Sequence, residues 1–458
     1  MKLTELTALE TAEAVNAGEI SARRLVETIL DFCRNLQGEK KLFASLAESS
    51  ALEQADLVDQ KIKNGFSLPL AGVPLVAGDD FAYSKGPTSL GSPAFKDYTA
   101  PFSAAAVEKL NGAGAVLIGK SAIGDLGLEE NGPARSRSAK ITGLCRPVLS
   151  LESDCSGAAR LGAAAEKVYC LRPTPGRVSR FGLHLRCGSF DQPALIAGTL
   201  TGLGVAFQAA AGYDQRDVLT SLNREQRAAQ TDDSSPIEKN VVAYCPALLE
   251  LLNPGEAKTL ELIRERLAGC GCTTMEVSLD YLEPALRAFY VIALAETSST
   301  LGRFDGIRFG SAAEANNLEE LYFNSRRLIF GEEARRRTIF GTYLLSQGNF
   351  DHYYLKALKV WNLFRDEFTR FFTRADFLLL PLTGSGVSNG EQADFLQTYE
   401  DYRFTAPLAM TGQPVLSLAT NGQLVGQAFS DEKLLSLGGL LTEQIEDEDL
   451  EEISRGEG

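Results

Sequence analysis

The sequence predicts an α/β protein whose sheet is covered by helices on both faces. Its 458 residues are 44% hydrophobic, which is enough to bury a substantial core. An apolar strand over residues 71–77 is followed by a helix around residues 103–110 and by a second apolar strand over residues 115–119. Such alternation is typical of a sheet that lies between layers of helices. We expect one large α/β domain or up to three smaller ones.

Residues 4–62 predict three helices ahead of the first strand. Apolar residues recur at helical spacing in the first two, of which the first ends at Gly18 and the second is capped by Ser21. Ser50-Ala-Leu-Glu53 has the capping-box pattern and predicts the start of the third helix, which closes near Gly65. We therefore expect residues 1–66 to form a helical region packed on a core domain, residues 67–442.

The far half of the chain predicts a buried helix, a buried strand and an acidic tail. Aromatic residues recur at helical spacing over residues 358–372, which indicates a core stripe. The run Phe377-Leu-Leu-Leu-Pro381 predicts a buried strand. Like charges dominate residues 443–458, and they favour a solvated helix end or disorder.

Composition excludes several classes of function. The net charge of −15 argues against a direct grip on nucleic acid, because such affinity rests on clustered Lys and Arg. No apolar run approaches the length of a membrane span, and the polar N-terminus lacks the features of a signal peptide. The eight cysteines are scattered, which indicates reduced thiols in a cytoplasmic protein. With only two histidines, a zinc site is not expected, and we expect no metal and no cofactor.

One nucleotide-binding pattern is present but lacks its context. Residues 114–121, Gly-Ala-Val-Leu-Ile-Gly-Lys-Ser, match the spacing of a phosphate-binding loop. Such a loop follows a strand and is flexible between its glycines, whereas here the four intervening residues are themselves the apolar strand. We do not expect nucleotide binding at this segment.

Two motifs resemble the active-site core of the amidase signature family. The loop Ser153-Asp-Cys-Ser-Gly-Ala-Ala-Arg160 is similar to the family's Ser-Asp-X-Gly-Gly-Ser-X-Arg loop, and it matches at Ser153, Asp154, Gly157 and Arg160. The strand Gly72-Val-Pro-Leu-Val-Ala-Gly-Asp79 is similar to the family's Gly-X-Pro-X-X-X-Lys-Asp strand. The segments 296–310 and 336–359 resemble the glutaminase subunit of the amidotransferases that act on glutamyl-tRNA(Gln) or aspartyl-tRNA(Asn). The resemblance implies the amidase-signature fold, with a mixed β-sheet.

The resemblance also implies that the catalytic centre is degenerate. Ala158 stands at the position of the family's nucleophilic serine, and Gly78 at that of its catalytic lysine. The glycine- and serine-rich loop whose serine relays protons between them has no counterpart between Lys120 and Ser153. The turn Cys155-Ser156-Gly157 retains backbone N–H donors of the kind that form an oxyanion hole. We expect Gly78, Ser156 and Ala158 to line one cavity.

The family's glutamine pocket is expected to be eroded in the same way. A tyrosine of the pocket corresponds to Phe304 or Phe309, each of which lacks the hydroxyl group. An aspartate that pairs with the substrate ammonium aligns with Tyr402, although Asp401 is adjacent. The arginine that grips the substrate carboxylate is retained as Arg337, or as Arg336 if the register slips by one residue.

Three functions are compatible with these substitutions. The first is that of a pseudoamidase, a catalytically degenerate amidase-like subunit that acts as scaffold or regulator for an amidotransferase-type protein partner. The second is an active amidohydrolase whose nucleophile has moved to Ser156 or Cys155 on the same loop. The third is a module that binds a small carbonyl or carboxylate ligand in the vacated pocket. The first is favoured over the second, because a nucleophile displaced by two residues is misplaced against the oxyanion donors.

Overall fold

The computed structural model describes residues 2–128, 136–220, 240–384 and 399–443. Among these residues the strands form one mixed sheet of 11 strands. In spatial order the strands are β1 (Phe43–Leu46), β3 (Val116–Ser121), β2 (Pro74–Gly78), β4 (Leu149–Asp154), β6 (Gln192–Ala197), β5 (Tyr169–Arg172), β10 (Val415–Ser417), β11 (Gly422–Gly426), β9 (Phe377–Pro381), β7 (Val241–Tyr244) and β8 (Thr273–Glu276).

Parallel and antiparallel pairs alternate in blocks across this sheet. β3, β2 and β4 are parallel neighbours, as are β9, β7 and β8. Antiparallel pairs join the two blocks through β6, β5, β10 and β11. The mixed sheet inferred from the resemblance is therefore confirmed.

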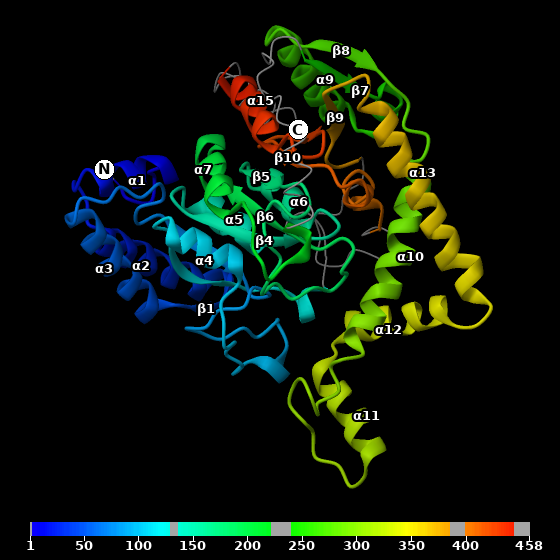
Figure 1. The fold of residues 1–458 in the computed structure, drawn as a ribbon, viewed down its shortest axis with the longest axis horizontal. Coiled ribbons are helices and arrows are strands. Elements are labelled where there is room, and N and C mark those ends of the chain that lie inside the picture. The colour runs from blue at the N-terminus through cyan, green and yellow to red at the C-terminus, as the bar shows by residue number, and fades with distance from the viewer. Residues whose placement is uncertain (1, 129–135, 221–239, 385–398, 444–458) are drawn as a thin grey trace.

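Helices cover both faces of the sheet, as expected (Figure 1). The described helices are α1 (Ala8–Asn16), α2 (Ala22–Lys40), α3 (Glu48–Lys63), α4 (Ala105–Gly112), α5 (Arg137–Leu144), α6 (Ala158–Ala165), α7 (Leu200–Ala210), α9 (Pro254–Gly269), α10 (Leu282–Leu301), α11 (Leu318–Ile329), α12 (Glu332–Leu345), α13 (Leu355–Phe371) and α15 (Asp431–Glu443). Successive strand residues point to opposite faces. Leu75 and Leu117 thus share a core with α4 and α7, whereas Val76 and Ile118 pack against α2 and α3.

The N-terminal region differs from its prediction in two respects. A short strand, β1, lies between α2 and α3 and pairs with β3 at the edge of the sheet. The helix α3 begins at Glu48 directly after it, and its N-cap residue Ala47 makes no side-chain cap. The capping box at Ser50 is therefore wrong. Ser50 already lies inside the helix, where its hydroxyl group donates to the Ala47 carbonyl at 3.1 Å.

The far half carries the longest helices. α13 buries Phe364 and Phe368 fully, which confirms the aromatic core stripe, and β9 has the predicted bounds. α10 packs against α12 and α13, while α11 projects away from the body of the molecule (Figure 1). The predicted boundary at residue 66 stays a prediction, and the acidic tail lies outside the described residues except for Glu443.

Candidate functional site

The carboxyl ends of three parallel strands meet at one edge of the sheet. β3, β2 and β4 end at Ser121, Gly78 and Asp154, respectively. The register of β2 against β4 pairs Ala77 with Leu151. Gly78 and the loop that follows Asp154 therefore lie at the same edge, where the resemblance predicts the amidase centre.

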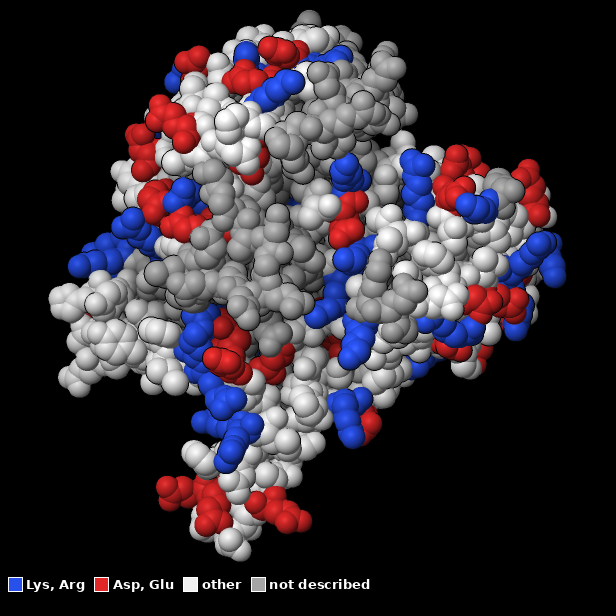
Figure 2. Space-filling view, turned by 180° about the vertical axis from the view of Figure 1, so that it is seen from behind, with Lys and Arg blue, Asp and Glu red and all other residues white. Residues whose placement is uncertain are grey.

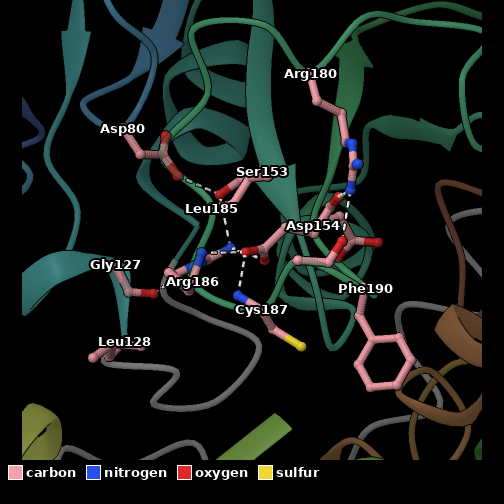
Figure 3. A network of polar contacts seen from close by, with 12 residues as sticks. Asp80, Gly127, Leu128, Ser153, Asp154, Arg180, Leu185, Arg186, Cys187 and Phe190 are labelled. Atoms are coloured by element: carbon pink, nitrogen blue, oxygen red, sulfur yellow. Dashed lines mark hydrogen bonds and ion pairs between the residues drawn. The ribbon is translucent and has the colours of Figure 1, made fainter. Parts of the chain in front are cut away.

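A buried arginine occupies the centre of this edge (Figure 3). Arg186 donates through Nη2 to the Ser153 hydroxyl at 2.9 Å and pairs with the Asp191 carboxylate at 3.1 Å. Its Nη1 donates to the Gly127 carbonyl. Ser153 in turn donates to the Asp80 carboxyl group. The space between the ends of β2 and β4 thus holds a connected polar network.

Two more ionisable groups lie beside this network. Burial raises the pKa of Asp80, although the nearby Arg186 guanidinium opposes this shift. Lys120, at the end of β3, is 1% exposed, and its ammonium group lies 3.5 Å from Asp79 and donates to the Phe81 carbonyl. Burial lowers the pKa of Lys120, whereas Asp79 and Asp80 raise it. The edge of the sheet therefore balances two buried cations against several carboxyl groups.

Gly78 has no room for a side chain in this arrangement. A Cβ atom added at Gly78 would meet Asp80 Oδ1 at 2.5 Å, closer than real Cβ contacts come. Asp80 is itself 2% exposed and held by Ser153. A side chain at residue 78 therefore requires Asp80 to move.

The loop after β4 is anchored by a buried ion cluster. Asp154 accepts a hydrogen bond from Arg160 Nε at 2.8 Å and lies 3.5 Å from Arg172, and all three side chains have no exposed surface. Arg160 also donates to the Gln423 side chain and to the Thr405 carbonyl, both at 3.1 Å. Asp154 and Arg160, both predicted site residues, are thus bound within the protein core, where they fix the start of α6.

Gly157 makes the turn that leads into α6. Its φ of +117° lies in the left-handed region that favours glycine, and a Cβ atom there would collide with Thr405. Ser156 is 1% exposed and Ala158 is partly buried. Gly78, Ser156 and Ala158 line neither of the two cavities considered next, so a cavity shared by the three stays a prediction.

A small cavity of about 10 Å³ lies beside Cys155 and is also lined by Arg337 and Cys187. The Cys187 thiol hydrogen bonds to Cys155 and donates to Glu296 Oε2 at 3.2 Å. Arg337 donates to Glu333 at 2.6 Å and to the Leu128 carbonyl at 3.1 Å. This volume suffices for about one water molecule.

A much larger cavity, of about 800 Å³, opens on the other side of Asp80. Phe304 and Phe309 line it together with Phe95, His184 and Arg303. Burial lowers the pKa of His184 to about 3, and the Arg303 and Arg186 guanidinium groups add to this shift, so the imidazole is neutral at physiological pH. Such a volume is in the range of small-molecule sites.

The predicted pocket residues are therefore divided among three places. Phe304 and Phe309 line the large cavity, and Arg337 lines the small one. Tyr402 is fully buried in the main hydrophobic core, and Asp401 beside it is 2% exposed. Arg336 pairs with Glu333 at 2.5 Å.

The expected absence of the relay loop concerns residues that are only partly described, because residues 129–135 lie outside the described ranges. In the described part of the interval, the hydroxyl groups of Ser121 and Ser138 are 2.7 Å apart. Ser136 caps α5 and donates to Glu152. Burial raises the pKa of Glu152 to about 7, an effect that the Ser136 hydrogen bond opposes.

Sequence reasoning missed Arg186 and the contact between Cys187 and Glu296. The only local signal for Arg186 is a charged residue in the otherwise weakly polar run 181–190, and its partners come from four distant segments. Within the described ranges, no cluster of His, Cys, Asp and Glu side chains is arranged to hold a metal ion. The described helices include none with the length and apolarity needed to span a bilayer.

Comparison with known proteins extends over nearly the whole chain. The family profile described as Amidase matches residues 24–132 and 138–435. The chain is 33% identical to the corresponding subunit of glutamyl-tRNA(Gln) amidotransferase from Deinococcus radiodurans, over 95% of this chain and 96% of that protein.

Two solved structures show the same fold at lower identity. Peptide amidase from Stenotrophomonas maltophilia superposes with a TM-score of 0.76 at 20% identity, covering 96% of this chain and 97% of that one. A protein from a vestigial complex, described as revealing the evolutionary origins of an s-triazine catabolic enzyme, superposes with a TM-score of 0.75 at 21% identity, covering 96% and 98%. By profile, sequence identity and fold, this chain belongs to the amidase signature family.

Proposed function

We propose that this chain is a catalytically degenerate amidase, a pseudoamidase that serves as scaffold or regulatory subunit in a complex of the tRNA-dependent amidotransferase type. The observation that carries the proposal is the environment of Gly78. Its position corresponds to the family's lysine, and the space beside its backbone is taken by the Asp80 carboxyl group. Similarity to subunits of glutamyl-tRNA(Gln) amidotransferase supports the choice of complex.

The chemistry of the edge supports the same conclusion. A hydroxyl nucleophile needs a positioned base to take its proton, and Ala158 has no hydroxyl group to activate. The nearest amine on the neighbouring strand is Lys120, which is bound by the Phe81 carbonyl and lies 3.5 Å from Asp79 and from the Thr88 hydroxyl group. An acyl-enzyme route therefore lacks both of its partners.

A retained surface fits a role in a larger complex. On α12 and the turn after it, Ile339, Tyr343 and Tyr353 are 69%, 54% and 44% exposed. The rings of Tyr343 and Tyr353 are 6.2 Å apart, so the two form one apolar face. Clustered exposed apolar side chains mark protein interfaces more often than free surface. We propose a cytoplasmic protein partner at this face, and no direct contact with nucleic acid.

The first test is enzymatic. The purified chain is expected to release no ammonia from glutamine, asparagine or simple aryl amides, because base and nucleophile are both missing. A coupled ammonia assay, with an active family member as positive control, measures this. Turnover that disappears on Ser156→Ala or Cys155→Ala would refute the proposal.

The second test concerns the partner. Affinity purification of the full chain from its native cytosol is expected to recover, at a fixed ratio, a defined companion that resembles a component of an amidotransferase. A chain that migrates alone as a monomer in lysate at every salt concentration tried would contradict the role in a complex.

An active amidohydrolase with a relocated nucleophile is the second candidate function. One observation favours Cys155 over Ser156 for that role. Cys155 borders the small cavity together with Arg337, and its thiol neighbour Cys187 is hydrogen bonded to Glu296. Intact-mass measurement after exposure to an activated ester probe distinguishes the candidates. A stoichiometric acyl adduct that is lost in Cys155→Ala supports this second function, and an unmodified mass excludes it.

A further inference from the structure

The large cavity beside Asp80 has a distinctly aromatic wall. Phe304 is at its centre, with the Phe95 ring 5.3 Å and the Phe309 ring 6.5 Å away between centroids, both in edge-to-face orientation. Tyr98 and Phe102 contribute further ring surface. A cavity of about 800 Å³ walled in this way accommodates a flat apolar body of one or two rings.

One cation in this cavity has no carboxylate partner. Arg308 pairs with Asp305 at 3.0 Å, and Lys96 lies 3.9 Å from Asp97. Arg303, by contrast, makes no ion pair with any described residue. Its Nη2 atom donates to the Leu185 carbonyl at 3.0 Å and contacts His184 Nδ1 at 3.4 Å, and its Nη1 atom makes no hydrogen bond within the described part of the chain.

The contact with His184 identifies the imidazole tautomer. A guanidinium group only donates hydrogen bonds, so Nδ1 of His184 accepts and the ring proton is on Nε2. This Nε2 atom is buried and has no partner among the described residues, although His184 lines the cavity. Two donor groups, from His184 and Arg303, are therefore available at one end of the aromatic wall.

The acidic group of the same cavity does not cancel the charge of Arg303. Asp80 interacts with Arg186 and Lys120 on the side of the sheet, and burial raises its pKa. The Arg303 guanidinium stacks near Phe304, with its central carbon 5.2 Å from the ring centroid, which holds the fork in a fixed orientation. The balance of charge therefore favours an anionic ligand, and the planar fork of arginine matches a carboxylate.

We propose that this cavity binds a small aromatic carboxylate, whose carboxylate group accepts from Arg303 and whose ring packs against Phe304 and Phe309. Such a ligand differs from glutamine, which carries no ring. The site does not depend on Gly78 or Ala158, so the inference stands apart from the loss of amidase chemistry.

Isothermal titration of the full chain with three naphthalene probes tests the proposal. We expect 2-naphthoate to bind saturably with one site per chain, and the neutral 2-naphthamide to bind about tenfold more weakly or less, because it cannot form the charged pair. The cation 2-naphthylmethylamine is expected not to bind. Equal affinity for acid and amide, tighter binding of the amine, or no saturable binding of 2-naphthoate would each overturn the proposal.

Matched arginine variants locate the site. Arg303→Gln is expected to lower the affinity for 2-naphthoate by about tenfold or more and to leave 2-naphthamide unaffected. Arg308→Gln, at the rim and already paired with Asp305, is expected to change the affinity for 2-naphthoate less than about threefold. Equal effects of the two substitutions would exclude Arg303 as the anchor. The probe series on the unmodified chain decides the question if Arg303→Gln fails to fold.

Phe309→Ala separates the ring contact from the charge contact. Phe309 is 51% exposed, so its truncation is expected to be tolerated by the fold. Affinity for the acid and for the amide should fall by a similar factor, because the ring is common to both probes. Unchanged affinity for both would show that the probes bind elsewhere and would contradict the assigned site.

Discussion

Asp80 and Arg186 lie where a repaired active site would need space, and they determine how the chain responds to restored family residues. We expect Gly78→Lys combined with Ala158→Ser to release no ammonia from glutamine. A side chain at residue 78 meets Asp80 Oδ1 at 2.5 Å, and its ammonium group would add a further cation beside Arg186. Steady-state ammonia release, with circular dichroism to verify folding, measures the outcome. Efficient hydrolysis by this double variant would mean that the centre is only two substitutions away from activity.

Glu152 predicts a pH dependence at the same scale. Its pKa of about 7 in the folded protein is above its ordinary value of 4.5. The folded state therefore binds this proton more tightly, and the resulting stabilisation is complete below pH 4.5 and is lost as the pH rises through 7. Glu152→Gln keeps a neutral acceptor for Ser136. We expect the melting temperature of the variant, relative to the unmodified chain, to rise between pH 5 and pH 8 by about 1–2 °C. A constant difference across this range would show that Glu152 titrates normally.

At the scale of elements, the turn into α6 depends on a backbone that only glycine adopts without strain. Gly157→Ala is expected to destabilise the protein by at least about 2 kcal/mol, because it combines a left-handed φ with a collision at Thr405. Gly112→Ala is the matched control. Gly112 ends α4, and an added Cβ atom there meets nothing within 4 Å, so this change should be neutral or stabilise by up to about 1 kcal/mol. Urea unfolding midpoints compare the two, and equal midpoints would contradict this account of the turn.

At the scale of the whole molecule, the partner surface and the cavity are separate. Figure 1 shows α12 near the arm that carries α11, and Figure 2 shows Lys and Arg gathered along the neck of this arm and Asp and Glu at its tip. We expect Ile339→Asp to weaken binding of the companion chain by at least about tenfold, because a charge would be buried at the apolar face. Size-exclusion chromatography with light scattering measures the complex. Arg303→Gln, in the cavity, should leave it intact, and the reverse pattern would place the interface elsewhere.

Local sequence patterns predicted the elements of this fold better than its site. β9 was predicted with its observed bounds because five apolar residues between polar neighbours leave little choice. β1 was missed because its four residues carry no alternation and acquire strand structure only by pairing with β3. The Ser50 capping box failed for a related reason, since β1 determines where α3 begins. The resemblance placed Gly78 and the loop after Asp154 at one edge, but the Arg186 network joins segments that no local pattern connects.

The order of strands in the sheet bears on how the chain is made. Central strand β5 gains its partner β10 only after most of the polypeptide has been synthesised, and Thr174, just beyond β5, waits for Asp431, which is 257 residues later. At ordinary translation rates this delay amounts to roughly 10–50 s on the ribosome. During that time the nascent chain presents an unpaired sheet edge in the middle of its future core, which is a template for unwanted pairing. Ribosome-associated chaperones are therefore expected to hold this nascent chain until β10 and β11 emerge.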